Sequence, residues 1–534
     1  MKKKLYLILG SFLALIICVG LFWGRQLKNA VMVSLISDEK QEDLLNELEL
    51  SENLEFQLLF QGERVPYDAV NDTYYLPMVT DEKWLWGDCF SLSGEDLRLK
   101  WCEDPYWKSL KDAIAEGHAF SFFVFDDQSA RKGKIVFTGI PMMRLETQQF
   151  LGDYYYYSRV TVFDPFHNTG GLYEITDCFG YLEIRGRTSK AFPKKGWDLD
   201  LVKENGQPYK TALFGLREDD DWKLNSLYPD GTKVKEMVCM ELWNSLAEDT
   251  ESVYDKGTNM EYFEMLMDQE YLGLYGAMEQ LDYKQFSLNK NEDVIYKSYA
   301  WPLERNPDRY APEEEAFGHL IKAADRQITE ELWQPLYEYV EAAGFAEEDG
   351  AGNREVFYEY LKEHMDMDNF LNIELYIETL YAFDNKYKNL YIAADRRDDG
   401  DYTLWKVPWD LNYTFGERFD VDANALTSYN LEWSRELMPQ FMMSEALLES
   451  GNKEFIKLLN AKWQKLQNGV LSVQNVQHIA EKHMERLVSS GAFARDERCW
   501  AEGPHNTSIE EMLEFHSCRL DFLDEHYQSF LNEN

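Results

Sequence analysis

Hydrophobic and polar positions divide the chain into three stretches. Residues 5–23 form one apolar run behind three lysines. Between residues 54 and 143, short alternating runs separated by turns predict a small, mostly β accessory domain. From about residue 151 strand-like runs come first and helical periodicity dominates later, which predicts an α+β domain. We therefore expect an anchor at 1–30, an accessory domain at 31–150 and a main domain at 151–534.

The main domain contains several segments with a clear period. Alternation predicts strands at 180–185, 197–202, 390–393 and 402–407, and a hairpin over 262–278. Apolar residues at helical spacing predict helices at 233–246, capped by the Asp230-Gly-Thr232 turn, and at 368–383, capped by Asp368. No internal repeat is present in the sequence.

The N-terminal apolar run is long enough to approach the thickness of a bilayer core. Its 19 residues follow Lys2, Lys3 and Lys4 and lack a clean cleavage site. We expect a signal anchor rather than a cleaved signal peptide, with the rest of the chain extracytoplasmic, at the cell surface. In an oxidising space, Cys89 with Cys102 and Cys499 with Cys518 could each close a short loop.

Composition changes this picture mainly through charge. Hydrophobic residues make up 45% of the chain, which excludes a disordered protein. The 96 acidic against 54 basic residues leave a formal net charge of −42, so the surface repels nucleic acid and favours basic partners. The phosphate loop, the dinucleotide-binding glycine motif, the zinc-protease motif and the serine-hydrolase elbow are all absent from the sequence.

Carboxylates and amides then carry the candidate chemistry. Asp384 follows a predicted buried helix and precedes Asn389 by five residues, a spacing that lets one loop supply both a proton acceptor and a magnesium ligand. Asp410 comes 26 residues after Asp384, at the end of a buried strand, and Asn412 follows. The short intervening hairpin would bring the carboxylates together, which requires a cation. Each of these residues, taken alone, is more typical of a turn than of a catalytic site.

A basic loop is the third feature. Five cationic residues lie between Arg185 and Lys195 in an otherwise acidic chain, and Arg forks and Lys point charges suit a polyphosphate. An exposed basic turn is the alternative interpretation of this loop.

These motifs occur in an order that resembles the CotH kinase family of spore-coat protein kinases. The elements are Arg185-Gly186 with Phe192-Pro-Lys194-Lys195, then Asp221-Trp222-Lys-Leu224, Asp230-Gly-Thr232, Tyr271-Leu-Gly273-Leu-Tyr275 with Glu279, Tyr296-Lys297, Asp384 with Lys388-Asn389, and Trp409-Asp410-Leu-Asn412 with Phe415-Gly416. The resemblance covers roughly residues 155–450 or beyond.

The resemblance implies an atypical protein-kinase-like fold that phosphorylates serines of basic, Lys/Arg-rich proteins, including spore-coat proteins. It implies ATP and Mg²⁺ or Mn²⁺ as cofactors. Asp384 resembles the catalytic base, and Asn389, Asp410 and Asn412 resemble the metal ligands. Lys194 is the first candidate for holding the ATP phosphates, and the other candidates are Lys195, Arg185, Glu279 and Lys297.

Two positions depart from the family pattern. Ala382 stands where the family often has Asn, and Asn412 stands where it has a second Asp, so metal binding there has less charge. The alternative functions are a weak or inactive kinase serving in surface or spore-coat assembly or adhesion, and a metal-dependent hydrolase built on Asp384 and Asp410. The hydrolase leaves the basic loop unexplained.

Overall fold

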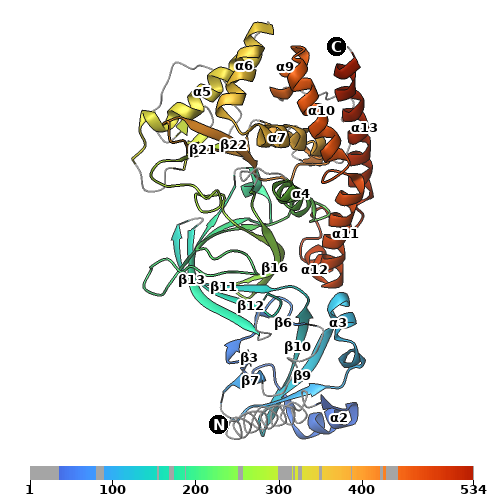
Figure 1. The fold of residues 1–534 in the computed structure, drawn as a ribbon. Helices are drawn as coiled ribbons and strands as arrows, with labels where there is room; N and C mark the ends of the chain where they lie inside the picture. The colour runs from blue at the N-terminus through green and yellow to red at the C-terminus, as the bar shows by residue number, and fades with distance from the viewer. Residues whose placement is uncertain are drawn as a thin grey trace, which may run out of the picture.

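A computed structural model describes residues 35–79, 89–94, 96–152, 155–167, 173–186, 188–249, 256–298, 315–316, 319–322, 327–347, 351–386, 388–420, 425–427 and 443–532. The chain rises in Figure 1 from a β-rich N-terminal part, through a barrel, to a helical C-terminal part. Helices α11 and α12 run back down beside the barrel.

The N-terminal part consists of two sheets and short helices. One sheet has the order β1-β8-β9-β10-β6-β5, with β2 paired to β10, and the other has the order β4-β3-β7. Aromatic side chains such as Phe60, Trp101, Phe120 and Phe122 fill the space between them. The elements are β1 (Leu35–Ile36), α2 (Asp38–Glu47), β2 (Glu49–Leu50), β3 (Gln57–Phe60), β4 (Glu63–Arg64), β5 (Tyr67–Asp68), β6 (Thr73–Pro77), β7 (Phe90–Ser93), β8 (Arg98–Cys102), α3 (Leu110–Glu116), β9 (Ala119–Phe125) and β10 (Ser129–Thr138).

Seven strands then close into a barrel in the order β11-β12-β13-β14-β15-β17-β16. The pairings are antiparallel except for the parallel contact of β11 with β16, which closes the ring. Alternate residues such as Val160, Leu182, Leu199 and Trp222 point inward and are buried. The strands are β11 (Met142–Gly152), β12 (Tyr155–Asp164), β13 (Glu174–Ile184), β14 (Trp197–Val202), β15 (Asp221–Asn225), β16 (Met260–Met267) and β17 (Glu270–Met278).

The C-terminal part combines a second sheet with helices. The sheet has the order β19-β20-β18-β21-β22, and β23 pairs with β24. The elements are α4 (Lys235–Asp249), β18 (Val294–Ser298), β19 (Glu315–Ala316), β20 (His319–Ile321), α5 (Glu330–Glu347), α6 (Ala351–His364), α7 (Met367–Leu380), β21 (Leu390–Arg396), β22 (Tyr402–Pro408), β23 (Arg418–Asp420), β24 (Ala425–Thr427), α9 (Met443–Glu449), α10 (Lys453–Gln467), α11 (Val473–Ser489), α12 (Ala492–Cys499) and α13 (Glu510–Asn532).

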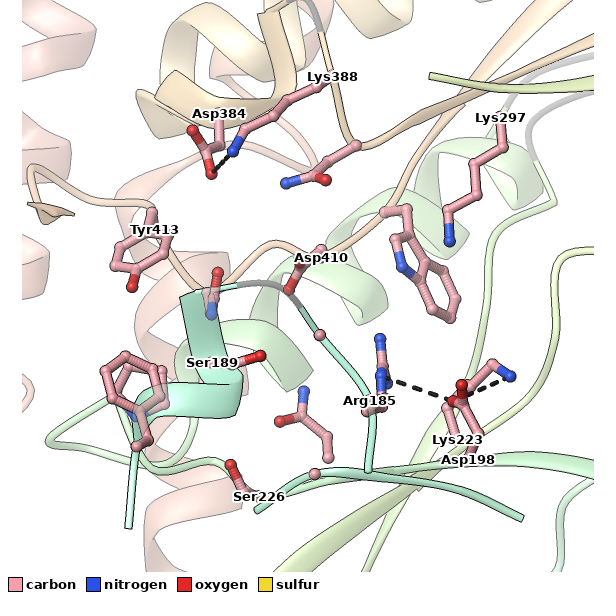
Figure 2. Close-up of a pocket in the computed structure, with 18 of the residues that line it drawn as sticks. Arg185, Ser189, Asp198, Lys223, Ser226, Lys297, Asp384, Lys388, Asp410 and Tyr413 are labelled. Atoms are coloured by element: carbon pink, nitrogen blue, oxygen red, sulfur yellow. Dashed lines mark ion pairs between the residues drawn. The ribbon is translucent and has the colours of Figure 1, made fainter. Parts of the chain in front are cut away.

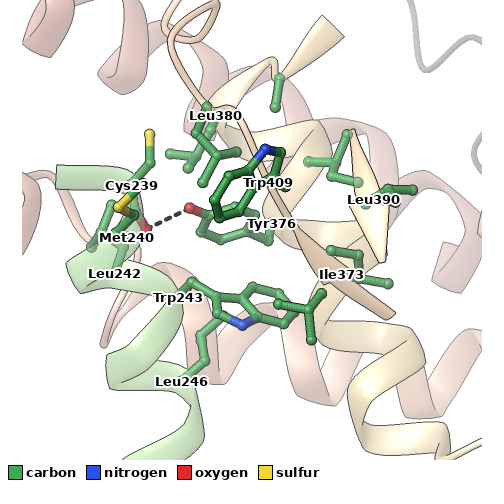
Figure 3. Close-up of a cluster of buried hydrophobic side chains, with 14 of the residues drawn as sticks. Cys239, Met240, Leu242, Trp243, Leu246, Ile373, Tyr376, Leu380, Leu390 and Trp409 are labelled. Carbon is green, nitrogen blue, oxygen red and sulfur yellow. Dashed lines mark hydrogen bonds between the residues drawn. The ribbon is translucent and has the colours of Figure 1, made fainter. Parts of the chain in front are cut away.

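One large core joins these helices to α4, which packs against α7. Trp243 of α4 meets Tyr376 of α7 edge to face, with ring centroids 5.2 Å apart. The Tyr376 hydroxyl donates a hydrogen bond of 2.6 Å to the Cys239 carbonyl (Figure 3). Aromatic pairs of this kind contribute roughly 0.5–1.5 kcal/mol beyond area burial. This packing fixes the end of α7, from which the candidate catalytic loop emerges.

The predicted fold class is wrong. We expected an α+β, kinase-like fold behind a membrane anchor, and the structure is instead a mixed α/β protein built around a closed seven-stranded barrel. The barrel closes through β11 and β16, which lie more than 100 residues apart in sequence, and local periodicity carries no signal for such a pairing. None of the helices in the described ranges is long and apolar enough to cross a membrane. The predicted anchor at 1–30 lies outside the described residues.

Two local expectations are also corrected. Helix α7 is capped by Asp366, whose side chain accepts a hydrogen bond from the Asn369 amide, rather than by Asp368. The cysteines in the described part of the chain are all free thiols, so the loops suggested for Cys89 with Cys102 and for Cys499 with Cys518 are not closed by disulfides. Cys178 and Cys239 are buried, and burial raises the pKa of each thiol to about 12.

Candidate functional site

A cavity of about 450 Å³ lies between the barrel and the C-terminal sheet. It collects side chains from three sources: the segment after β13 with strands β14 and β15, the C-terminal sheet, and the two loops that flank β21 and β22. Figure 2 shows Asp384 and Lys388 on one wall and Arg185, Asp198 and Lys223 on the opposite wall, with Asp410 between them.

The first loop carries Asp384 in a 3₁₀ turn just after α7. Its neighbour Asn385 is buried and donates to two carbonyls, that of Asn389 at 2.9 Å and that of Trp409 at 2.7 Å. The Trp409 amide donates to the Asn389 carbonyl at 2.9 Å. These bonds join the start of β21 to the end of β22 and so bring Asn389 beside Asp410.

The backbone at both positions is unusual. Asn389 has a φ of 55° and Asp410 a φ of 58°, in the left-handed region that Asn and Asp tolerate better than most residues. Non-glycine residues in this region cluster at functional sites, because the surrounding structure must hold them there. Both Asn389 and Asp410 line the cavity.

Asp384 forms an ion pair with Lys388 at 2.8 Å. Burial raises the pKa of the Asp384 carboxyl, Lys388 opposes that rise, and the negative charge of Asp410 adds to it. The group is therefore a better proton acceptor than an exposed aspartate once it is ionised.

Cationic side chains surround these carboxylates. Lys297 lies 5.7 Å from the ring centroid of Tyr391 and 5.9 Å from that of Trp409, and Arg185 packs on the same Trp409 ring at 5.9 Å. Burial and the nearby Lys223 lower the pKa of the Lys322 amine. The lining contains five basic residues, Arg185, Lys223, Lys297, Lys322 and Lys388, and three acidic ones, Asp198, Asp384 and Asp410.

The structure brings six of the predicted site residues together at this cavity: Arg185, Lys297, Asp384, Asn389, Asp410 and Asn412. The other three predicted phosphate-binding residues, Lys194, Lys195 and Glu279, do not line it. Lys195 donates instead to the carbonyls of Lys190 and Phe192 at 2.7 and 2.6 Å. Glu279 accepts from the Arg217 amide and the Asn259 side chain at 2.8 and 2.7 Å.

Lys194 is fully buried in an ion pair. Its ammonium lies 2.6 Å from Asp496 of α12, and Asp496 also accepts a 2.9 Å hydrogen bond from the Leu274 amide. Lys194 and Lys233 hold the pKa of the Asp496 carboxyl well below its usual range despite burial. In this structure Lys194 therefore fastens the barrel to the C-terminal helices.

Sequence reasoning missed three residues near the cavity: Lys223, Lys322 and Glu236. Lys322 directly follows β20 and belongs to none of the motifs found in the sequence. Glu236 lies in the first turn of α4 and bonds to Asn225, and burial with the charge of Asp410 raises its pKa to about 8. Glu236 directly precedes the apolar residues Met237 and Val238 in the predicted helix, and this position was the available signal.

Oxygen atoms suited to a divalent cation are present. The side-chain oxygens Asn412 Oδ1 and Glu236 Oε1 are buried and have no hydrogen-bond partner among the described residues. Buried polar atoms normally have partners, so these two fit a cation held with Asp410 and Asn389. No cluster of three or more His, Cys, Asp or Glu side chains forms a metal site in the described ranges, so any such site must rely on amide oxygens.

Comparison with known protein families agrees with the order of the motifs. A model of the family described as CotH kinase protein matches residues 182–523. The matched region begins within β13, at the wall of the cavity, and ends in α13. A search of curated proteins finds no match to the chain.

Proposed function

Because the chain belongs to the CotH kinase family, we propose that it is a phosphotransferase whose active site is the cavity lined by Asp384, Asn389 and Asp410. One observation carries this proposal. A protein with a net charge of −42 places five basic side chains around two catalytic-type aspartates. Positive charge gathered against such a background suits a polyphosphate donor.

Each side chain then has a role that follows from its chemistry. Asp384 accepts the proton of the acceptor hydroxyl, because its raised pKa and its position at the cavity wall suit a general base. Lys388 holds that carboxylate in place at 2.8 Å until substrate arrives. Arg185, Lys297 and Lys322 bind the donor phosphates. ATP would supply the phosphoryl group, and Mg²⁺ or Mn²⁺, held by Asn389, Asp410 and Asn412, would offset its charge.

The acceptor in this proposal is a serine of a basic protein, with spore-coat or surface proteins as candidates and an extracytoplasmic or spore-envelope location. The acidic surface supports a basic partner through charge attraction. Detection of tagged protein by immunogold labelling tests the location.

A transfer assay tests the proposed activity. Purified protein is incubated with radiolabelled ATP, Mg²⁺ or Mn²⁺ and a Ser/Lys-rich peptide, and label on the peptide is counted. Replacing Asp384 with Asn should lower transfer by about 10²–10⁴-fold, the usual contribution of a general base, while nucleotide binding stays measurable. Asp399→Asn is the matched control, because Asp399 is an exposed carboxylate in a distant turn.

Two outcomes separate the alternatives. Equal transfer by the wild type and Asp384→Asn would remove Asp384 as the base. Nucleotide binding without any transfer would favour a non-catalytic role in assembly or adhesion. Asn412 would explain such a result, because an amide in place of a carboxylate binds a metal ion with less charge.

A further inference from the structure

The outer face of the barrel on strands β12 to β15 carries an ordered set of side chains. In antiparallel pairs, directly opposed residues lie on the same face of the sheet. One row runs Tyr155, Glu183, Asp198 and Lys223, and the next runs Tyr157, Tyr181, Asp200 and Asp221. The intervening residues, such as Leu182, Leu199 and Trp222, point inward and are buried. We call this set, with Phe179, the aromatic–acidic face.

The aromatic rings of this face stack on one another at the outer surface of the barrel. Tyr155 and Tyr181 stack at 5.8 Å and Tyr157 and Phe179 at 5.4 Å between ring centroids, and Tyr155 is 37% exposed. Figure 1 shows α4, α11 and α12 along the other side of the barrel, near β16. Rings that stack on the outside of a sheet add nothing to the barrel core, and they present flat π surfaces to a partner.

The acidic half of the face is only partly neutralised by ion pairs within the chain. Lys223 pairs with Asp198 at 3.0 Å and with Asp221 at 3.4 Å, whereas Glu183 and Asp200 form no ion pair with another described residue. Burial and the charge of Asp221 raise the pKa of Asp200 to about 6, as expected for crowded carboxylates. A cation from outside the chain would relieve this crowding.

The face is continuous with the candidate active site. Asp198 and Lys223 end the first row and also line the cavity, where Asp198 lies between Arg185 and Lys223 (Figure 2). Three strand spacings separate β12 from β15, roughly 14 Å in all. About four extended residues span that distance. A chain crossing the face from Tyr157 would therefore deliver a residue to the cavity mouth.

We propose that the aromatic–acidic face is a docking site for a Lys/Arg-rich segment of the protein that receives the phosphoryl group. This proposal rests on the proposed phosphotransferase function. Lysine and arginine side chains stack on Tyr155, Tyr157, Phe179 and Tyr181 and pair with Glu183 and Asp200. With one cation docked at Tyr157, the acceptor serine lies about four residues away from it.

Direct binding tests this surface independently of catalysis. The probe is a fluorescein-labelled peptide of alternating Lys and Gly without any hydroxyl residue, titrated with the full-length protein and followed by anisotropy. We expect Tyr157→Ala/Tyr181→Ala to raise the Kd about tenfold, because roughly two cation–π contacts are lost. We expect Glu183→Gln/Asp200→Asn to raise the Kd about three- to tenfold, because roughly two ion pairs are lost. The control is Asp43→Asn/Glu47→Gln on α2, where the same two charges are lost from an exposed helix.

The possible results are distinct. Equal losses in the control and in Glu183→Gln/Asp200→Asn would mean non-specific attraction to an acidic protein and would overturn the proposal. So would tight binding of a neutral polysaccharide that depends on the tyrosines alone. Circular dichroism checks that each variant is folded. Asp384→Asn should keep binding to the Lys/Gly peptide. If the wild-type protein binds the Lys/Gly peptide but transfers no phosphate to the Ser/Lys-rich peptide, the phosphotransferase function is disproved and the docking face is not.

Discussion

Asp384 and Lys388 form an ion pair at the wall of the cavity. Burial raises the pKa of Asp384, so its carboxylate form is lost on acidification at a higher pH than for an exposed aspartate. A reaction that needs the carboxylate should slow as the pH falls through that raised pKa. Lys388→Met removes a charge that lowers the pKa, and the acidic limb of the rate profile should move to higher pH.

Transfer rates measured from pH 4 to pH 8 check this expectation. Lys210→Met is the matched control, because Lys210 is exposed, pairs with Asp220 at 3.7 Å and does not line the cavity. An acidic limb that stays in place in Lys388→Met would mean that another group limits the rate.

Gly273 shows why one family motif needs glycine. Its φ is 83°, and a Cβ there would lie 2.4 Å from Asp496 Oδ1. Gly273→Ala should therefore push Asp496 away from Lys194 and the Leu274 amide, and should cost about 3–5 kcal/mol of unfolding free energy, as for a broken buried ion pair. Urea denaturation measures this loss.

Gly206→Ala is a control for backbone strain alone, because Gly206 has a φ of 79° and a Cβ there would meet nothing within 4 Å. It should cost only about 1 kcal/mol. Similar losses in the two variants would show that the approach of Asp496 contributes nothing.

The candidate site could be predicted from sequence as far as its local residues. Asp384, Asn389 and Asp410 lie on one hairpin and its flanking loops, so their spacing predicts their meeting. The environment of Lys194 depends on Asp496, which is 302 residues away, and no local pattern marks such a partner. The position of Lys194 in a basic loop therefore predicted a phosphate ligand, although its actual partner is Asp496 in α12.

At the scale of elements, helices α4 and α11 are joined by a three-residue cluster. Glu241 accepts hydrogen bonds from His483 and Lys482 at 2.7 Å each. The His483 bond, with help from Lys482, lowers the pKa of Glu241 from 4.5 to about 2. A depressed carboxyl pKa adds stability that is present above the unfolded value and is lost as the pH falls from about 4.5 to 2.

Glu241→Gln should accordingly lower the unfolding free energy at pH 7 by about 1 kcal/mol, a value reduced for partial exposure to solvent. It should also flatten the stability curve of the protein between pH 4.5 and pH 2, the interval set by the two pKa values. Thermal unfolding across this range measures both effects, with exposed Glu359→Gln as the control. An unchanged pH profile would show that the cluster does not couple the helices.

The residue ranges of strands with a clear alternating pattern could be predicted from the sequence. The hairpin expected over 262–278 is β16 with β17, and the strands expected at 390–393 and 402–407 are β21 and β22. What could not be predicted was their assembly, since β17 pairs with β15 as well as with β16. Turn residues specify a hairpin, but the pairing of separate hairpins depends on contacts distant in sequence.

At the scale of the whole molecule, the N-terminal sheets contact the barrel through an apolar patch. Tyr75 of β6 stacks on Tyr271 of β17 with centroids 4.7 Å apart, beside Met142 and Leu266. Tyr75→Ala should cost about 3 kcal/mol of unfolding free energy, as for other large-to-small changes at buried sites. Tyr75→Phe keeps the ring and should cost less than 1 kcal/mol.

Differential scanning calorimetry can show how the parts are coupled. If the patch joins them, Tyr75→Ala should separate one unfolding transition into two or broaden it. A single transition with an unshifted midpoint would mean that the two parts unfold together for another reason.

The Lys194–Asp496 pair also has a consequence for how the chain is made. Lys194 leaves the ribosome long before Asp496 does, because 302 residues separate them. At about 5–20 residues per second this delay is roughly 15–60 s. During that time Lys194 has no Asp496 carboxylate with which to pair, so burying its ammonium group in the barrel segment would be unfavourable. A nascent chain should therefore complete its barrel only when α12 is available, and a chaperone that shields the segment would raise the yield.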